Sequence, residues 1–351
     1  MGDSAGFRAH GCGATTVRSV ASPFAGLPRI SLEIERVEHA LLASLQADDP
    51  YLTELASHLA KAGGKRLRPV MAIAAGSCGL RPVPGAGLPP VSDEVILGGV
   101  SVELVHLGSL YHDDVMDEAE TRRGVESVNA RWGNLRAILA GDFLLAKASE
   151  IAASLGTEVA GLLAATIGSL CEGQVRELQT TFDATRTEDQ YLAAIAGKTA
   201  SLFASACRIG AIVAELPREQ IEALTVFGDR YGMAFQIIDD ILDVVATDEQ
   251  LGKPAGNDLA EGIYTLPILR ALRSAAEGPQ LAALLGGPLG PADVAHARDL
   301  VRATTGVTDA REVALHYCDE AIGAISGFEP GPAVDHLHSL ATGLLDTVPA
   351  P

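Results

Sequence analysis

Aromatic residues are scarce in this chain, and so are long runs of the β-branched residues that favour strands. Phenylalanine, tyrosine and tryptophan make up 4% of the 351 residues, whereas alanine and leucine, both good helix formers, are abundant. The composition therefore argues against an extensive β-sheet and predicts an all-α fold. With 48% hydrophobic residues, the chain can bury the core of a single large helical domain.

The chain also lacks cysteine motifs and long apolar segments. Its five cysteines occur in no CxxC or CxH pattern, so we expect reduced thiols, no structural metal and a cytoplasmic location. No run of 18 or more apolar residues is present, so the sequence predicts no transmembrane segment.

Basic residues are also few in this chain. The chain has 26 lysine and arginine residues against 45 aspartate and glutamate residues, which gives a formal net charge of −19. A chain this acidic repels nucleic acid, so we expect no nucleic-acid partner. An anionic substrate must therefore bind where basic residues gather locally.

The apolar pattern places the catalytic domain between residues 30 and 346. Residues 1–29 are rich in small and hydroxyl residues; a transit peptide can have this composition, but we expect a disordered tail. Residues 347–351 form a second short tail. Within the domain we expect loops at 81–92 and 275–295, and helices near 93–118, 133–155, 157–180, 187–214, 217–246 and 308–346.

Two aspartate clusters lie in the predicted helices. HDDVMD occupies residues 112–117 and IDDILD occupies residues 238–243. The outer aspartates of each cluster share one helix face, and the middle one lies about 100° round the helix. The clusters contain Asp113, Asp114, Asp117, Asp239, Asp240 and Asp243.

Both clusters lie in apolar stretches, where carboxylates are costly unless something neutralises them. Like charges one turn apart destabilise a helix by about 0.2–0.5 kcal/mol per pair, and burial raises that cost. A solvated helix face would explain one such cluster, but it explains two poorly. Carboxylate oxygens suit Mg²⁺, which proteins hold with one or two carboxylates plus substrate phosphates. The sequence therefore predicts a site for Mg²⁺ and phosphate.

Basic residues gather near these clusters. GGKRLRP at 63–69 places Lys65 and Arg68 beside two glycines, which let a backbone approach an anion closely. Arginine can also bind a phosphate with two parallel hydrogen bonds. His106 lies seven residues before Asp113 on the same helix face, and is either a core histidine or a substrate ligand. Further donors are Arg122, Arg123, Lys198, Thr199 and Lys253.

In their order, these motifs resemble the trans-isoprenyl (polyprenyl) diphosphate synthase family, of the long-chain type. The likeness covers about residues 30–270 and rests on GGKRLRP, ELVHLGSLYHDDVMDEAETRRG, GDFLLA, GKTASLF, FQIIDDILDV and LGKPAGNDL. The resemblance implies an all-α bundle around a deep central cavity, in a homodimer. It also implies a Mg²⁺-dependent prenyltransferase that joins isopentenyl diphosphate head-to-tail to an allylic diphosphate.

The resemblance implies roles for individual residues. Three Mg²⁺ per substrate-bound site would be expected, with ligands from Asp113, Asp117 and Asp239. Asp114 and Asp240 would support these ligands, and Asp243 would lie alongside them and contact the substrate. The allylic diphosphate would be contacted by Arg122, Lys198, Thr199, Gln236 and Lys253. The diphosphate of isopentenyl diphosphate would be bound by Lys65, Arg68, His106 and Arg123.

Two positions depart from the family pattern. The family often has a lysine in a Gly-Lys-x-Thr-Leu-Pro run after the second cluster, and here Ile263 occupies that position, so one diphosphate cation is missing. Gln174 stands where a glutamate is frequent, and we expect this change to be mild.

Product length is expected to depend on Gly108 and Ser109, which lie about 6–7.5 Å below Asp113 along the helix. In the family, bulky aromatic residues there stop chain growth at fifteen carbons, whereas glycine and serine leave the path open. We therefore expect a C30–C50 product of the kind used for quinone side chains. Release of such an apolar product would bring the enzyme into peripheral contact with a membrane.

Three other readings stay open. Neighbouring helices could close the cavity and give the C20 product, geranylgeranyl diphosphate. A terpene cyclase carries a DDxxD motif as well, but it does not need the isopentenyl-binding cations. A non-catalytic subunit of a heteromeric synthase would typically lose an aspartate cluster, and both are complete here.

Overall fold

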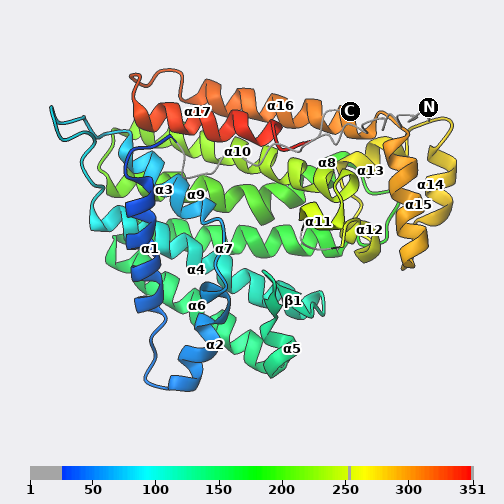
Figure 1. Cartoon of the computed structure of the whole chain (residues 1–351), viewed down its shortest axis with the longest axis horizontal. Coiled ribbons are helices and arrows are strands. Elements are labelled where there is room, and N and C mark those ends of the chain that lie inside the picture. Colours follow the sequence, from blue (N-terminus) through cyan, green and yellow to red (C-terminus); the bar gives the residue numbers. More distant parts are fainter. Residues whose placement is uncertain (1–25, 252–253, 349–351) are drawn as a thin grey trace, which may run out of the picture.

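The computed structural model describes residues 26–251 and 254–348, and most of them are helical (Figure 1). Within these ranges the one sheet is a two-stranded antiparallel hairpin, β1 (Thr121–Arg122) and β2 (Val125–Glu126). Thr121 pairs with Glu126 and Arg122 with Val125. The all-α expectation is thus confirmed, and its small exception carries one of the expected substrate-binding arginines.

The helices follow one another along the chain. They are α1 (Ile30–Ser44), α2 (Pro50–Lys61), α3 (Leu67–Ser77), α4 (Asp93–Met116), α5 (Val128–Trp132), α6 (Asn134–Ser154), α7 (Thr157–Leu178), α8 (Glu188–Ile195), the π-helical turn η1 (Ala196–Ala200), α9 (Ser201–Val213), α10 (Arg218–Val245), α11 (Asp248–Leu251), α12 (Asn257–Glu261), α13 (Leu266–Ala271), α14 (Gly278–Leu284), α15 (Pro291–Arg302), α16 (Gly306–Ala324) and α17 (Pro332–Leu345).

The helical segments expected between residues 93 and 246 are confirmed as α4, α6, α7, the continuous run α8–η1–α9, and α10. The expected segment 308–346 is interrupted at residues 325–331, where glycine and proline separate α16 from α17. The loop expected at 275–295 is partly wrong, because α14 and the start of α15 lie there. Both helices have proline in their first turn, where the missing N–H costs no helical hydrogen bond.

The two helices that carry the aspartate clusters, α4 and α10, lie at the centre of the fold. α4 begins after Ser92, whose hydroxyl oxygen accepts a hydrogen bond from the backbone N–H of Val95 (3.4 Å) and so caps the helix. It packs against α3, α6 and α9, whereas α10 packs against α9 and α16. Figure 1 shows α4, α7, α9 and α10 side by side across the middle, with α16 and α17 along one edge. Both clusters fall in the last turns of their helices, so this packing sets how they meet.

Two helical runs are long and apolar enough to cross a membrane by length and composition, Asp93–Met116 and Glu188–Val213. Most of each apolar window is buried inside the molecule, 72% and 61% respectively. Core helices of this kind pass the same test, so the expectation of no transmembrane segment is compatible with the structure.

Candidate active site

Two cavities adjoin where the aspartate-bearing ends of α4 and α10 meet. The cation-lined cavity, of about 740 Å³, has apolar walls and the basic residues Lys65, Arg66, Arg68, Arg123 and Lys198. The acid-lined cavity, of about 890 Å³, contains Asp113, Asp117, Glu177, Asp240 and Asp258. The residues that line both are Leu110, Asp113, Met116, Gln174, Leu178, Lys198, Thr199 and Gln236.

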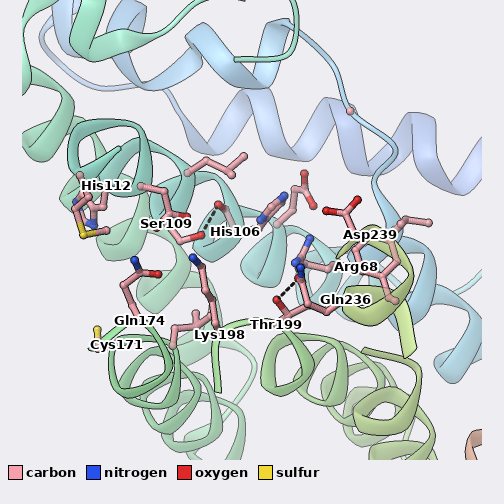
Figure 2. A pocket seen from close by; sticks show the side chains of 18 of the residues that line it. Arg68, His106, Ser109, His112, Cys171, Gln174, Lys198, Thr199, Gln236 and Asp239 are labelled. Atoms are coloured by element: carbon pink, nitrogen blue, oxygen red, sulfur yellow. Dashed lines mark hydrogen bonds between the residues drawn. The ribbon is translucent and has the colours of Figure 1, made fainter. Parts of the chain in front are cut away.

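The cation-lined cavity brings together residues from distant parts of the sequence. Figure 2 shows His106, Ser109 and His112 along α4, with Cys171 and Gln174 of α7 facing them. Lys198 reaches in between, and Arg68 lies near Gln236. All four residues expected to bind isopentenyl diphosphate line this cavity: Lys65, Arg68, His106 and Arg123.

The glycine pair at 63–64 lets Arg123 pack against this basic segment. Gly64 has a φ of +151°, and a Cβ placed on it would lie 2.9 Å from the Arg123 guanidinium. Arg123 also donates a hydrogen bond to the carbonyl oxygen of Gly63. A side chain at position 64 would therefore displace Arg123, which explains why this position needs glycine.

A buried ion-pair network holds the basic segment in place. Arg66 is buried and donates to Glu103 (2.9 Å) and Glu38 (2.6 Å) and to the carbonyl oxygen of Ala60 (2.9 Å). Arg123 lies 3.9 Å from the same Glu103 carboxylate. Neither Arg66 nor Glu103 has a role that the sequence pattern reveals. A buried and an exposed arginine look alike in a basic turn, and the partner of a helical glutamate depends on tertiary packing.

The cation-lined cavity carries more positive charge than its own acids neutralise. Burial lowers the pKa of Arg68 to about 10, and its Nε has no hydrogen-bond partner among the described residues. Burial, followed by the positive charges of Arg68 and Arg123, holds the pKa of His106 well below its usual value. An anion bound here would relieve both effects, because it supplies the missing negative charge and hydrogen-bond acceptors.

The three aspartates of the first cluster have different environments. Asp113 and Asp117 line the acid-lined cavity, and Asp113 lines both cavities. Asp114 is buried, lines neither cavity, accepts a hydrogen bond from Arg122 Nε (2.7 Å) and forms an ion pair with Arg122 Nη2 (2.6 Å). Asp114 therefore positions Arg122, which is the expected contact for the allylic diphosphate and lines the acid-lined cavity.

The three aspartates of the second cluster also have different surroundings, but in another arrangement. Asp239 is exposed and lines the cation-lined cavity, whereas Asp240 is buried in the wall of the acid-lined cavity. Asp243 is not among the residues that line either cavity. Its carboxylate accepts hydrogen bonds from the backbone N–H groups of Asn257 (3.3 Å) and Asp258 (3.1 Å) at the start of α12. The structure therefore gives Asp243 an anchoring role in place of the expected substrate contact.

Lys198 and Thr199 lie in the π-helical turn η1, between the cavities. Two glycines allow this turn to touch α7: a Cβ on Gly173 would lie 2.4 Å from the Lys198 backbone nitrogen, and one on Gly197 would lie 2.7 Å from the Ser169 carbonyl oxygen. The Lys198 ammonium donates to Glu177. Although burial lowers it, the negative charges of Glu177 and Asp113 keep the pKa of Lys198 above its usual value. Lys198 thus stays charged where the cavities join.

A chain of hydrogen bonds connects the two cavity walls. Thr199 Oγ1 donates to Gln236 Oε1 (2.7 Å), and Gln236 Nε2 donates to Asp240 Oδ1 (2.8 Å). Tyr191 donates from its hydroxyl to the other Asp240 oxygen (2.5 Å). Both oxygens of this buried carboxylate are therefore held, and the side chains expected at 199 and 236 act on the second aspartate cluster.

Several functional candidates could not have been found from the sequence pattern alone. Glu177 lies one helical turn after Gly173 on α7, so helical spacing predicts that the two share a helix face. Its ion-pair partner Lys198 comes from another element and could not be predicted in this way. Arg186, in the α7–α8 connection, and Tyr191, in α8, line the acid-lined cavity and reach it only through tertiary packing. Lys253 lies outside the described residues.

The two positions expected to control product length point to different places. Ser109 lines the cation-lined cavity. Gly108 is not among the residues that line either cavity, and a Cβ there would lie 3.1 Å from the Gly141 carbonyl oxygen and 3.2 Å from the Leu145 side chain of α6. The expectation that position 108 faces the cavity is therefore wrong, because this face of α4 packs against α6.

The acid-lined cavity fits a divalent cation. Burial, and then the nearby Asp117 charge, raise the pKa of Asp113 to about 6 against the opposing effect of Lys198. Burial likewise raises the pKa of Asp117. Among the described residues no three acidic, histidine or cysteine side chains form a metal site by themselves. Aspartates that lack neutralising charge but form no closed cage suit an ion completed by phosphate oxygens.

Comparisons with known proteins agree with this geometry. The polyprenyl synthetase family model matches residues 49–303. Nonaprenyl diphosphate synthase from Mycobacterium tuberculosis is 41% identical over 82% of this chain and 84% of its own length.

Solved structures agree as well. Polyprenyl synthase from Caulobacter crescentus, complexed with calcium and isoprenyl diphosphate, has a TM-score of 0.85 at 32% identity, covering 93% of this chain and 98% of that one. Geranylgeranyl pyrophosphate synthase from Corynebacterium glutamicum, with the same ligands, has a TM-score of 0.78 at 39% identity, covering 90% and 95%. On these matches and on the two complete aspartate clusters, the chain belongs to the polyprenyl synthetase family of prenyltransferases.

Proposed function

We propose that this enzyme adds isopentenyl diphosphate units head-to-tail to an allylic diphosphate and makes an all-trans product of C30–C50. The observation that carries the proposal is the junction of the cation-lined and acid-lined cavities at Asp113, Lys198, Thr199 and Gln236. A reaction between two diphosphates needs two anion sites that meet at the reacting carbons. The similarity to nonaprenyl diphosphate synthase supports the long product.

In this proposal the cation-lined cavity holds isopentenyl diphosphate. Arg68 and Arg123 lie at its wall together with Lys65, and the neutral His106 can donate a further hydrogen bond without adding charge. Fixed arginines suit a diphosphate because their planar N–H groups match its oxygens. The apolar side chains of Leu110 and Phe235 exclude water from the path of the reacting double bond.

The acid-lined cavity would hold the allylic diphosphate together with Mg²⁺, three ions per site. Asp113 and Asp117 of this cavity, and Asp239 at the adjoining cation-lined cavity, would be the ligands. When bound, the metal supplies positive charge that stabilises the departing diphosphate. Arg122 and Lys198 donate to the same diphosphate, and Asp114 and Glu177 keep these two cations in place. Thr199 and Gln236 stand at the junction, where the allylic carbon would meet the double bond.

A second function differs from the proposed one in product length. The Corynebacterium glutamicum neighbour is a geranylgeranyl synthase, so a C20 product is the alternative. Ser109 lines the cation-lined cavity and has no bulky aromatic ring that would block a growing chain. This supports the longer product, and Ser109→Phe should shorten it because the new ring would stand in the cavity.

The test is to incubate the protein with Mg²⁺, isopentenyl diphosphate and each allylic primer, and to size the products by chromatography. We expect C30–C50 from the wild type and a shorter series from Ser109→Phe. A wild-type product that stops at C20 would support the alternative. A cyclic hydrocarbon from farnesyl diphosphate alone would indicate a cyclase, and no reaction with any primer would indicate a non-catalytic subunit.

We further propose that the enzyme is a cytoplasmic homodimer that touches a membrane surface only to release its product. Large apolar side chains are exposed on neighbouring faces of α6 and α7, which pack against each other. A second copy would cover them, since exposed apolar patches commonly mark interfaces. The side chains are Leu135, Ile138 and Leu139 of α6, together with Val175 and Leu178 of α7, which also line the cation-lined cavity. Sedimentation velocity would test the dimer, and Leu139→Lys should weaken it.

A further inference from the structure

Arg186 is a buried cation in the acid-lined cavity to which neither the sequence pattern nor the proposed mechanism gives a role. It lies in the connection between α7 and α8, is only 5% exposed, and is among the residues that line this cavity. Arginine is seldom buried this deeply without partners, because removing its charge from water is costly. Its partners therefore decide whether it is structural.

The partners that Arg186 has leave most of its hydrogen-bonding capacity unused. Nη1 donates to the carbonyl oxygen of Tyr264 (3.2 Å), and the guanidinium carbon lies 5.5 Å from the centre of the Tyr191 ring. Nε and Nη2 are buried and have no hydrogen-bond partner among the described residues. One side of the guanidinium is thus fixed, while donors on the rest of the group are unsatisfied.

Glu177 and Asp240, the two carboxylates whose charges act on Arg186, already accept hydrogen bonds from other donors. Glu177 accepts from Lys198, and both oxygens of Asp240 accept from Tyr191 and Gln236. Thr265, in the wall of the same cavity, also has a buried hydroxyl without a partner among the described residues. Two sets of polar atoms in one cavity wall therefore lack a partner, and a ligand with several acceptor oxygens would satisfy both.

The position in this wall where the family resemblance implies a lysine carries no cation. Ile263 lines the acid-lined cavity at the position where a basic side chain would be expected, and it lies two residues before Thr265. Arg186 reaches the same wall through its hydrogen bond to Tyr264, the residue between them. A positive charge is therefore present at this wall, but it comes from a different part of the chain.

We propose that Arg186, with the Thr265 hydroxyl, binds the terminal phosphate of the allylic diphosphate in the acid-lined cavity and supplies the charge that Ile263 does not. This inference rests on the proposed function, because it assigns the diphosphate to this cavity. A guanidinium with free Nε and Nη2 groups can donate two parallel hydrogen bonds to one phosphate. The Tyr264 carbonyl and the Tyr191 ring fix its direction before the ligand arrives.

The experiment measures binding apart from turnover. Isothermal titration calorimetry with Mg²⁺ and either inorganic diphosphate or the unreactive farnesyl thiolodiphosphate would compare wild type, Arg186→Gln and Arg186→Lys. Arg273→Gln is the matched control, since Arg273 is an exposed arginine at the same end of the molecule that pairs with Glu188 and lines neither cavity. A fourth protein combines Arg186→Gln with Ile263→Lys.

We expect Arg186→Gln to weaken binding of both probes about 10- to 100-fold, as for loss of a charge-assisted hydrogen bond. The affinity of Arg186→Lys should lie between those of wild type and Arg186→Gln, because a point charge replaces a planar pair of donors. Ile263→Lys should recover part of the loss, which a purely structural arginine would not allow. The KM for isopentenyl diphosphate and the affinity of Arg273→Gln should stay within about twofold of wild type.

Two results would overturn the inference. The first is a folded Arg186→Gln protein, as judged by its thermal melting curve, that binds both probes as wild type does. The second applies if Arg186→Gln does not fold. In that case, a folded Arg186→Lys protein that binds both probes with the affinity of wild type would rule out the contact between Arg186 and the diphosphate. A wild type that binds diphosphate but elongates no primer would overturn the proposed function instead, so the two failures are distinguishable.

Discussion

The two aspartate clusters have the same spacing but different surroundings. In the first, two aspartates face the acid-lined cavity and the buried Asp114 holds Arg122. In the second, Asp239 lies at the cation-lined cavity, Asp240 is held by Tyr191 and Gln236, and Asp243 holds the start of α12. Spacing therefore determines which aspartates share a helix face, whereas the neighbouring elements determine which of them meet a ligand.

Removing a cavity-facing aspartate of the first cluster should have the largest effect on activity. Asp113→Ala is expected to lower kcat about 10²- to 10³-fold, because it removes a carboxylate that both cavities share and that would hold the metal. Steady-state kinetics over a range of Mg²⁺ concentrations would measure it. Asp299→Ala, on the exposed face of α15, is the control. An unchanged kcat would remove Asp113 from the metal site.

The anchoring aspartate of the second cluster should behave in the opposite way. Asp243→Ala is expected to lower the free energy of unfolding by about 1–3 kcal/mol, since two backbone N–H groups at α12 lose their acceptor. Its kcat should fall far less than that of Asp113→Ala. Urea unfolding together with kinetics would separate the two, and a kcat loss as large as at Asp113 would contradict the distinction between them.

The hydrogen bond between Tyr191 and Asp240 should set the ionisation of the second cluster. Burial raises the pKa of Asp240, and the Tyr191 hydroxyl opposes this increase. Tyr191→Phe should therefore raise that pKa further, move the acidic limb of the kcat/KM profile to higher pH, and lower kcat/KM about tenfold near neutral pH. A pH–rate profile would measure this. An acidic limb at its original pH would show that Asp240 does not control it.

His106 should give the smallest effect, on the pH dependence of stability without ligand. Burial and nearby arginines lower its pKa in the folded protein, so the unfolded chain binds the proton first as pH falls. Stability should therefore be lost as pH falls below about 6.5, at no more than about 1.4 kcal/mol per pH unit. His106→Asn should have a flatter profile in urea unfolding between pH 7 and 5. Equal slopes would indicate that His106 is not held as a neutral ring in the folded protein.

The sequence predicted the fold class and most of the site, because both rest on local signals. Helical periodicity identified α4, α6, α7 and α10, and the aspartate spacing identified the residues at their ends. The four residues expected to bind isopentenyl diphosphate do line one cavity. These predictions succeeded because spacing along a helix fixes which side chains share a face.

The remaining errors concern what lies opposite a helix face. Gly108 was expected in the cavity but faces α6, and Asp243 was expected at the substrate but holds α12. Glu177 and Arg186 were missed because their importance depends on Lys198 and on the cavity wall, which come from other segments. No spacing rule within one helix reports on such contacts.

By itself, then, the sequence determined that two carboxylate clusters would end two apolar helices, with basic segments nearby to accept a diphosphate. Only the tertiary structure decided which carboxylates face the cavities and which hold arginines or backbone in place. The physical reason is that helix periodicity is a property of neighbouring residues, whereas desolvation and charge pairing depend on side chains brought together from the whole chain.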